Sequence, residues 1–309
     1  MCCLFGILDY GNALTPSQKK HVLSVLSRAC EVRGTDATGI AYNAKGSLHI
    51  YKRPLPARYM RFRVPNGINY IMGHTRLSTQ GDERHNQNNH PFLGTVSKVP
   101  FALAHNGVLN NDWELRRKKK LPVTTIETDS YVAVQIIERF GELSFESLKQ
   151  MAEQVSGTFT FTLLDHRDNL YIVKGNNPLH LYHWPQLGLY LYASTEDILK
   201  KALQGIRIKL GKPSEIDIDS GEILCIDRHG RVTKACFDDT HLYLYGGYSR
   251  YYWPHAFSFW DTFSAYDRYI DELKSVARAF GYSPEDVDVL LKEGFTPEEI
   301  EESLYCMEM

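Results

Sequence analysis

Two cysteines follow the initiating methionine, and an apolar run begins directly after them, as Met1-Cys2-Cys3-Leu4-Phe5-Gly6-Ile7. Removal of Met1 would leave Cys2 with a free α-amine beside its own thiol. An ordinary α-amine titrates near pH ~8 and a free thiol near ~8.5, so a base and a nucleophile would share one residue. An N-terminal amine is one known activator of a hydroxyl or thiol nucleophile. The alternative is that both cysteines are small apolar residues at the start of a buried strand.

Other polar residues stand at the ends of predicted segments. Asn106-Gly107 follows an apolar strand, and a side-chain amide with a neighbouring backbone N–H can form an oxyanion hole. Arg76 ends another strand, and its planar guanidinium matches a carboxylate. Asp129 lies at a predicted helix start, where its charge is favoured, and it can hold an ammonium group. Together with Cys2, these residues suit a free α-amino acid with a side-chain amide, and glutamine fits.

Each of these signals also has an ordinary structural interpretation: a turn after a strand, a surface charge, or a helix cap. A second chemistry to consider is metal binding by four histidines, His74, His85, His90 and His105. Their spacings fit no compact metal site, so we expect neither a metal nor another cofactor.

Bulk composition limits the class of protein. The chain has 309 residues, 43% apolar and 23% charged, and a formal net charge of −2, which gives no reason to expect nucleic acid or an acidic membrane as partner. Its six cysteines are scattered without a Cys-x-x-Cys motif, so we expect reduced thiols in a cytoplasmic protein. We see no secretory signal and no apolar run long enough to cross a bilayer.

The elements that must position these residues form a mixed pattern. Many short strands with a few long helices predict an α+β fold in which helices cover two sheets. The expected strands are residues 3–8, a hairpin at 40–51, and 70–76, 101–105, 157–165, 170–173, 179–182, 187–193 and 223–226; the expected helices are 16–32, one capped by Thr128 with an apolar face at 131–137, and 145–155.

The mixed pattern ends near Asp239, so we expect a first domain over residues 2–239. Residues 240–264 form an aromatic-rich linker or arm, since ten aromatics lie between His241 and Phe263. Residues 265–309 are expected to form a small helical module, with helices over Tyr266–Phe280, from Ser283-Pro284 to Lys292, and after Gly294-Phe295-Thr296-Pro297.

Six short motifs follow one another along residues 2–237: Cys2-Cys3-Leu4-Phe5-Gly6, Arg33-Gly34-Thr35-Asp36, Gly73-His74-Thr75-Arg76-Leu77-Ser78-Thr79, Asn89-His90-Pro91, His105-Asn106-Gly107 and Thr128-Asp129-Ser130. In these motifs the sequence resembles the glutaminase domain of class II glutamine amidotransferases, within the N-terminal-nucleophile hydrolases, and above all the glutaminase half of glucosamine-6-phosphate synthases. The resemblance implies a four-layer αββα sandwich.

The resemblance also implies roles for individual residues. Cys2 would be the nucleophile and its α-amine the base, acting through a water, while Asn106 and Gly107 would form the oxyanion hole. Cys2 would form a γ-glutamyl thioester that water then hydrolyses. Arg76, helped by Thr79, would bind the substrate carboxylate. Asp129, with Gly107, would bind the substrate amine. The implied supporting residues are Arg33, His74 and Gln80, of which Gln80 replaces a common histidine.

The predicted function is therefore a glutamine amidotransferase subunit that hydrolyses L-glutamine. Only about seventy residues follow Asp239, so we expect the ammonia to reach a separate synthase or ligase subunit. One alternative is a γ-glutamyl hydrolase of the same fold, since Arg76 and Asp129 would suit both substrates. Another is a non-catalytic glutamine-binding regulatory module.

Overall fold

The computed structural model describes residues 2–242 and, further on, residues 270, 273–274, 277, 282–293, 295–297, 299–300 and 303. The chain divides into two compact units, Met1–Asp239 and Thr240–Met309, and we describe each by itself. The predicted aromatic arm at 240–264 lies almost wholly outside the described residues, as does most of the helix predicted over Tyr266–Phe280. The three-part division of the chain thus stays a prediction.

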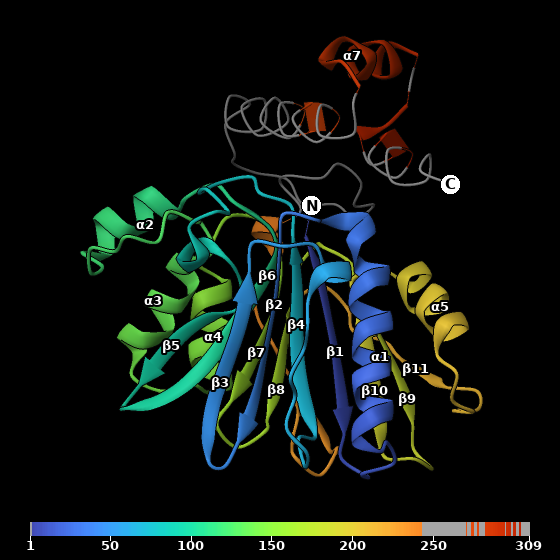
Figure 1. Cartoon of the computed structure of the whole chain (residues 1–309). Coiled ribbons are helices and arrows are strands. Elements are labelled where there is room, and N and C mark those ends of the chain that lie inside the picture. The colour runs from blue at the N-terminus through green and yellow to red at the C-terminus, as the bar shows by residue number, and fades with distance from the viewer. Residues whose placement is uncertain are drawn as a thin grey trace. The chain divides into compact units, whose positions relative to one another are not determined.

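The first unit is built on two antiparallel sheets (Figure 1). The strand order is β11-β9-β10-β1-β4-β2-β3 in the seven-stranded sheet and β13-β12-β8-β7-β6-β5 in the six-stranded sheet. The strands are β1 (Cys3–Asp9), β2 (Ala37–Ala44), β3 (Ser47–Arg53), β4 (Tyr70–Arg76), β5 (Phe92–Val96), β6 (Val99–Leu109), β7 (Gly157–Asp165), β8 (Leu170–Lys174), β9 (His180–Trp184), β10 (Leu189–Ala193), β11 (Ser214–Ile216), β12 (Glu222–Ile226) and β13 (Val232–Cys236).

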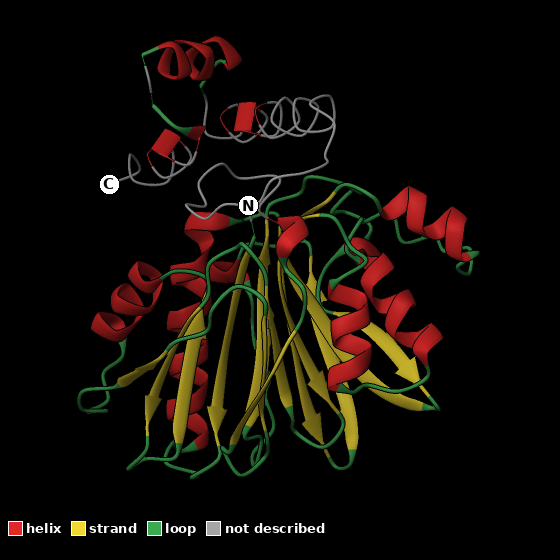
Figure 2. Cartoon of the chain, turned by 180° about the vertical axis from the view of Figure 1, so that it is seen from behind, coloured by secondary structure: helices red, strands yellow, loops and turns green. Residues whose placement is uncertain are grey.

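Helices cover the outer face of each sheet (Figures 1 and 2). Helices α1 (Pro16–Ala29) and α5 (Glu196–Gly205) pack on the seven-stranded sheet, and α3 (Tyr131–Phe140) and α4 (Phe145–Ala152) pack on the other. One further helix of the unit, α2 (Asp112–Lys119), follows β6. The predicted α+β sandwich of four layers is confirmed.

Local sequence signals explain where most helices begin. The Thr15 hydroxyl accepts a hydrogen bond from Gln18 N, and the Gln18 side chain accepts one from Thr15 N. This capping box starts α1 at residue 16, where the helix was predicted to begin. The expectation that Thr128 caps α3 is wrong, because Ser130 occupies that position and the Thr128 hydroxyl donates to Asn88 O at 2.8 Å instead. Helix α5 was not predicted, although Thr195 caps it through Ile198 N.

In the second unit, helix α7 (Pro284–Lys292) confirms the helix predicted from Ser283-Pro284. Ser283 and Asp286 form a reciprocal capping box there, and Thr296 and Glu299 exchange the same pair of hydrogen bonds at the start predicted for the last helix. Within the described ranges, no helix has the length and apolar character that crossing a bilayer requires.

Strand β1 lies between β10 and β4 in the middle of its sheet, and its side chains alternate between two cores. Cys3 and Phe5 pack in the core beneath α1, whereas Leu4 and Leu8 pack in the core between the two sheets. The strand passes close to its neighbour at Gly6, where an added Cβ would lie only 2.2 Å from the Tyr192 ring. The start of β1 is therefore held deep inside the sandwich.

Three buried histidines join the sheets near that end of β1. His74 Nε2 donates to His105 O at 2.9 Å, which links β4 of one sheet to β6 of the other. The His90 ring lies 4.3 Å from the His74 ring and 4.4 Å from Phe92, between centroids. Burial lowers the pKa of His74 and of His105 to about 3, and it holds the pKa of His90 well below its ordinary value. At neutral pH all three rings are therefore uncharged.

We predict that acid destabilises the fold through these histidines. Below pH ~6.5 these histidines bind protons in the unfolded chain but not in the folded one. The free energy of unfolding therefore decreases as the pH is lowered below ~6.5, and these histidines do not change it above that pH. From pH 7.5 to 5.5 each histidine should cost about 1.4 kcal/mol of unfolding free energy. Substitution of His90 by Phe keeps an aromatic ring and should reduce the loss by about that amount, as measured by denaturant titration at both pH values.

Buried carboxyls with raised pKa values, such as Asp129, respond to acid with the opposite sign. The prediction is therefore tested by comparing the pH dependence of the unfolding free energy in the His90→Phe variant with that in the unsubstituted chain. The pH dependence of either protein alone does not test it. An identical pH dependence in both proteins would contradict the prediction.

Candidate active site

The residues singled out in the sequence meet at one end of the space between the sheets. Side chains alternate along a strand, so Cys2 continues the inward-facing series of Leu4 and Leu8, and Asn106 continues that of Ala102 and Ala104. By the same alternation, Arg76 follows the inward-facing Met72 and His74 on β4. The hydrogen bond from His74 to His105 O brings the end of β4 next to the residue before Asn106.

Cys2 is buried at the mouth of this space, with 8% of its surface exposed, and its Sγ lies 3.5 Å from Leu77 O. Burial raises the pKa of the Cys2 thiol above its ordinary value; the charge of Arg76 acts against this shift and that of Asp129 adds to it. Both charges therefore lie near the sulfur. Because the thiol is protonated at neutral pH, a reaction at Cys2 needs a base.

The backbone around Cys2 is fixed from both sides. Arg33 is buried, and its Nε donates to Cys2 O at 3.0 Å, which matches its predicted supporting place near the N-terminus. One residue later, Leu4 N donates to the buried Ser194 hydroxyl at 2.8 Å. Met1 lies outside the described residues, so the α-amine of Cys2 stays a prediction.

Asn106 carries a buried amide without a protein partner. It has no exposed surface, and neither its Nδ2 nor its Oδ1 makes a hydrogen bond to any residue that the structure describes. An unmade hydrogen bond of this kind costs about 1–3 kcal/mol, so such a group calls for a ligand or a water. Its own backbone is held, because Asn177 Nδ2 donates to Asn106 O at 2.9 Å.

Gly107 is required by its backbone. Its φ is +139°, and an added Cβ would lie 2.0 Å from Thr158 O. Only glycine therefore keeps the chain close to β7 directly after Asn106. The adjacent amide and backbone N–H have the chemistry of an oxyanion hole.

Arg76 is 2% exposed and is surrounded by oxygen atoms of its own chain. Its Nη1 donates to Asn89 Oδ1 at 2.7 Å, and its Nη2 donates to Gln80 O at 2.6 Å and Gly81 O at 2.8 Å. A guanidinium has five N–H donors, so these bonds leave the Nε donor and one Nη1 donor for a ligand. Either of these donors can bind a carboxylate oxygen.

Asp129 supplies the opposite charge. It is 2% exposed; its Oδ2 accepts from Leu109 N at 2.6 Å, and the Ser130 hydroxyl donates to its Oδ1 at 3.2 Å. Burial raises the pKa of Asp129, whereas these hydrogen bonds and the charge of Arg76 act to lower it. A buried anion near a buried cation suits a ligand that carries both charges.

Two of the predicted site residues do not turn toward this cluster. Thr79 is exposed, and no described contact joins it to Arg76. The Gln80 side chain points to the chain after α2, where its Nε2 donates to Glu127 O at 2.9 Å and lies 3.4 Å from Asp112 Oδ2. It is the Gln80 carbonyl, rather than its side chain, that contacts Arg76.

Asn88, Asn89 and Lys52 were not among the predicted site residues, although Asn89 belongs to the Asn89-His90-Pro91 motif. Residues 80–89 are polar and have no hydrophobic pattern, yet both asparagines are fully buried. Lys52 Nζ donates to Asn89 O and, at 3.1 Å, to Pro91 O; burial and the nearby charge of Arg76 lower its pKa to about 8. A pair of consecutive asparagines directly before His90-Pro91 is the one signal that the sequence offered.

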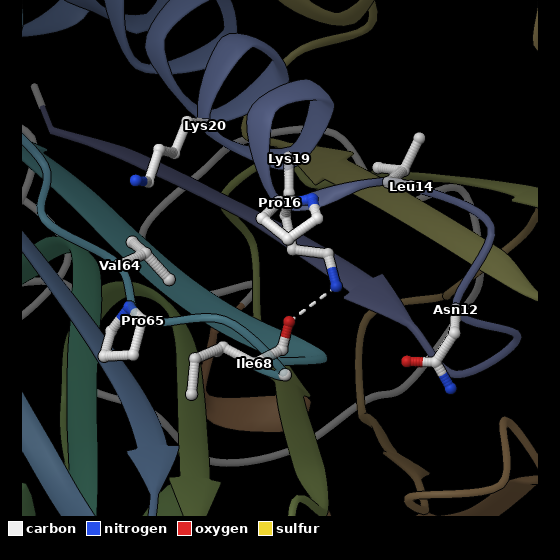
Figure 3. A pocket seen from close by; sticks show the side chains of 9 residues that line it. Asn12, Leu14, Pro16, Lys19, Lys20, Val64, Pro65 and Ile68 are labelled. Carbon is white, nitrogen blue, oxygen red and sulfur yellow. Dashed lines mark hydrogen bonds between the residues drawn. The ribbon is translucent and has the colours of Figure 1, made fainter.

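A hollow beside α1 lies at the other end of β1 and has a different character (Figure 3). Its Lys19 forms a buried ion pair with Asp9, the last residue of β1, at 2.9 Å, and donates to Ile68 O at 2.5 Å. That cation already has an ion-pair partner and a hydrogen-bond acceptor. Among the described residues no three His, Cys, Asp or Glu side chains are arranged to hold a metal.

Part of the chain matches a known protein family. Residues 74–201 match the family described as "Glutamine amidotransferase domain". The glutamine–fructose-6-phosphate aminotransferase (isomerizing) of Halalkalibacterium halodurans is 32% identical over 187 residues, which cover 58% of this chain and 30% of that protein. The enzyme of the same name from Staphylococcus aureus is 32% identical over 194 residues, covering 59% and 30%. The chain thus spans about 30% of the length of these relatives.

Solved structures show the same fold. Glutamine phosphoribosylpyrophosphate amidotransferase from B. subtilis superposes with a TM-score of 0.60 at 19% identity, covering 77% of this chain and 49% of that one. A structure described as the allosteric regulatory enzyme of purine biosynthesis gives 0.61 with the same identity and coverage. The predicted resemblance is confirmed: this chain contains a class II glutamine amidotransferase domain of N-terminal-nucleophile hydrolase fold, homologous to that of the glutamine–fructose-6-phosphate aminotransferases.

Proposed function

We propose that this domain hydrolyses the side-chain amide of L-glutamine through a thioester on Cys2. The observation that carries the proposal is the fully buried, unpartnered amide of Asn106, which faces the same inter-sheet space as the Cys2 thiol. A buried donor without a protein partner is ready for an oxygen that gains charge during a reaction. A thiol beside such a donor suits acyl transfer.

Binding follows from the two buried charges. Arg76 would bind the α-carboxylate of glutamine through its free Nε or Nη1 donor, and Asp129 would bind the α-ammonium group. With both ends of the amino acid held, the side chain extends toward Cys2 and Asn106. Hydrolysis of γ-glutamyl peptides by the same site is the competing reaction, since such peptides present the same two groups.

The chemistry takes two steps. The α-amine of Cys2, freed by removal of Met1, would take the thiol proton through a water as sulfur attacks the amide carbon. Asn106 Nδ2 and Gly107 N–H would stabilise the oxyanion of the tetrahedral intermediate. When this intermediate collapses, the C–N bond breaks, and the leaving nitrogen takes a proton and departs as ammonia. Water then attacks the thioester, so glutamine and water give glutamate and ammonia, and the thiol is restored.

Substitution of Cys2 by Ala tests the nucleophile. We expect ammonia release from glutamine to fall more than about a thousandfold, as for other nucleophile replacements, while glutamine still binds. The matched control is Cys3→Ala, because Cys3 points into the core beneath α1 and should keep activity. Ammonia from glutamine and glutamate from γ-glutamyl peptides should be measured side by side, together with the mass of the N-terminus.

Undiminished ammonia release by the Cys2→Ala protein would refute the assignment. So would full activity of a chain that retains Met1. Faster cleavage of γ-glutamyl peptides than of glutamine would favour the competing hydrolase.

Substitution of Asn106 by Ala tests the oxyanion hole. We expect kcat to fall by about 10²–10³, as when one donor is removed from similar sites. The melting temperature should change little, because the Asn106 side chain makes no hydrogen bond to the described chain. Asn43→Ala serves as a control with the opposite expectation. Asn43 Nδ2 donates to Asp165 O at 2.7 Å, far from Cys2 along the sandwich. Its loss should lower the stability of the fold and leave kcat unchanged. Equal kcat in both variants would contradict the prediction.

We further propose that the ammonia passes to an acceptor site on a separate synthase or ligase. The support is that the relatives' names describe transfer of glutamine nitrogen to fructose 6-phosphate. The aromatic-rich residues 240–264 are the proposed docking element, since clustered aromatic side chains suit interfaces.

If the chain docks on an acceptor enzyme, the two should co-purify. With amide-labelled glutamine, the labelled nitrogen should then appear in the product of that enzyme. Deletion of residues 241–309 should abolish that co-purification and send the label to free ammonium, while leaving glutamine hydrolysis in place. Equal recovery of the enzyme by both chains would exclude these residues as the docking element.

A further inference from the structure

Two consecutive buried asparagines stand between the two charged groups of the site. Asn88 and Asn89 have no exposed surface, and both side chains are fully engaged. We propose that they are positioning residues that set the separation of Arg76 and Asp129, and thereby select a substrate with a carboxylate and an ammonium group on one carbon. This inference rests on the proposed function.

Asn89 fixes the guanidinium. Its Oδ1 accepts from Arg76 Nη1 at 2.7 Å, and its Nδ2 donates to Glu83 O at 2.7 Å. An amide whose oxygen and nitrogen are both bonded cannot turn without breaking one of them. Since Lys52 Nζ also donates to Asn89 O, the backbone of this residue is held as well. Asn89 thus determines where the free donors of Arg76 point.

Asn88 fixes the segment that carries Asp129. Its Oδ1 accepts from Glu127 N at 2.9 Å, and its Nδ2 donates to Glu127 Oε2 at 2.8 Å and to Asp82 O at 3.0 Å. Its carbonyl oxygen accepts from the Thr128 hydroxyl at 2.8 Å. All but one of these bonds reach the two residues directly before Asp129. Asn88 therefore anchors the backbone from which that carboxylate projects.

Adjacent residues have Cα atoms only about 3.8 Å apart, so the two asparagines act as one rigid link. Asn89 holds the guanidinium of Arg76, and Asn88 holds the segment that carries the carboxylate of Asp129. An α-amino acid presents its carboxylate and its ammonium group at a fixed separation on a single carbon. Losing one asparagine should loosen one charge and leave the other in place.

Three amides separate the two effects: glutamine, glutaramate, which lacks the α-ammonium group, and γ-aminobutyramide, which lacks the α-carboxylate. For Asn89→Leu we expect KM to rise at least tenfold for glutamine and glutaramate and to stay unchanged for γ-aminobutyramide. For Asn88→Leu the rise should appear with glutamine and γ-aminobutyramide and not with glutaramate. In both variants kcat for glutamine should stay within about twofold.

Aspartate substitutions guard against failure to fold. In Asn89→Asp the acceptor for Arg76 remains, but its charge competes with the substrate carboxylate, so the selectivity of Asn89→Leu should recur. In Asn88→Asp the donor to Glu127 is lost and two carboxylates face each other, so the selectivity of Asn88→Leu should recur. The matched control is Gln87→Ala, since Gln87 is exposed and its Nε2 reaches only Thr125 O, at 3.0 Å. All three KM values should stay unchanged in that variant.

Equal losses for all three amides, or none, in the Asn88 and Asn89 variants would overturn the inference, because a merely structural role does not distinguish the substrates. Failure of the unsubstituted chain to release ammonia from glutamine would instead refute the proposed function. The two failures are thus separate outcomes of the same assay.

Discussion

The guanidinium of Arg76, buried between the two sheets, influences several ionisable groups of the candidate site. Arg76 is 2% exposed, and burial of a guanidinium is costly unless oxygen atoms surround it. The loop after β4 provides those oxygens through Gln80 O, Gly81 O and the Asn89 side chain. The chain therefore has to fold back over the end of β4, and two polar residues at the end of that loop, Asn88 and Asn89, become fully buried.

The charge of Arg76 then sets the state of its neighbours. It disfavours further positive charge, so that, after burial itself, it helps to lower the pKa values of Lys52, His74 and His90. It favours negative charge, and so it works against the burial that raises the pKa values of Cys2 and Asp129. Burial is the main reason that the histidines are neutral and can pack ring against ring, and the charge of Arg76 adds to this effect at His74 and His90. Fold and site thus depend on the same charge.

How far the sequence predicts this arrangement depends on the range of the interactions. Local signals succeeded: the start of α1, the hairpin of β2 and β3, and the helix beginning at Ser283-Pro284 all depend on neighbouring residues. Helix α5 was not predicted, although the Thr195 cap is equally local, because the segment lies between predicted strands. Asn88 and Asn89 could not be predicted as buried, since their partners lie up to 40 residues away in sequence. The unpartnered amide of Asn106 likewise arises only when the two sheets pack together, so it could not be predicted from the sequence.

The same electrostatics narrow the choice of a base for the Cys2 thiol. An effective general base has a pKa near the working pH, and a histidine whose pKa lies at about 3, as for His74 and His105, holds a proton too weakly to serve. Lys52 has a pKa of about 8, but its Nζ donates to two carbonyl oxygens and is committed as a donor. The α-amine of Cys2, with an ordinary pKa of about 8, needs no such commitment. This reasoning supports the proposal that chain processing, rather than any side chain of the site, supplies the base.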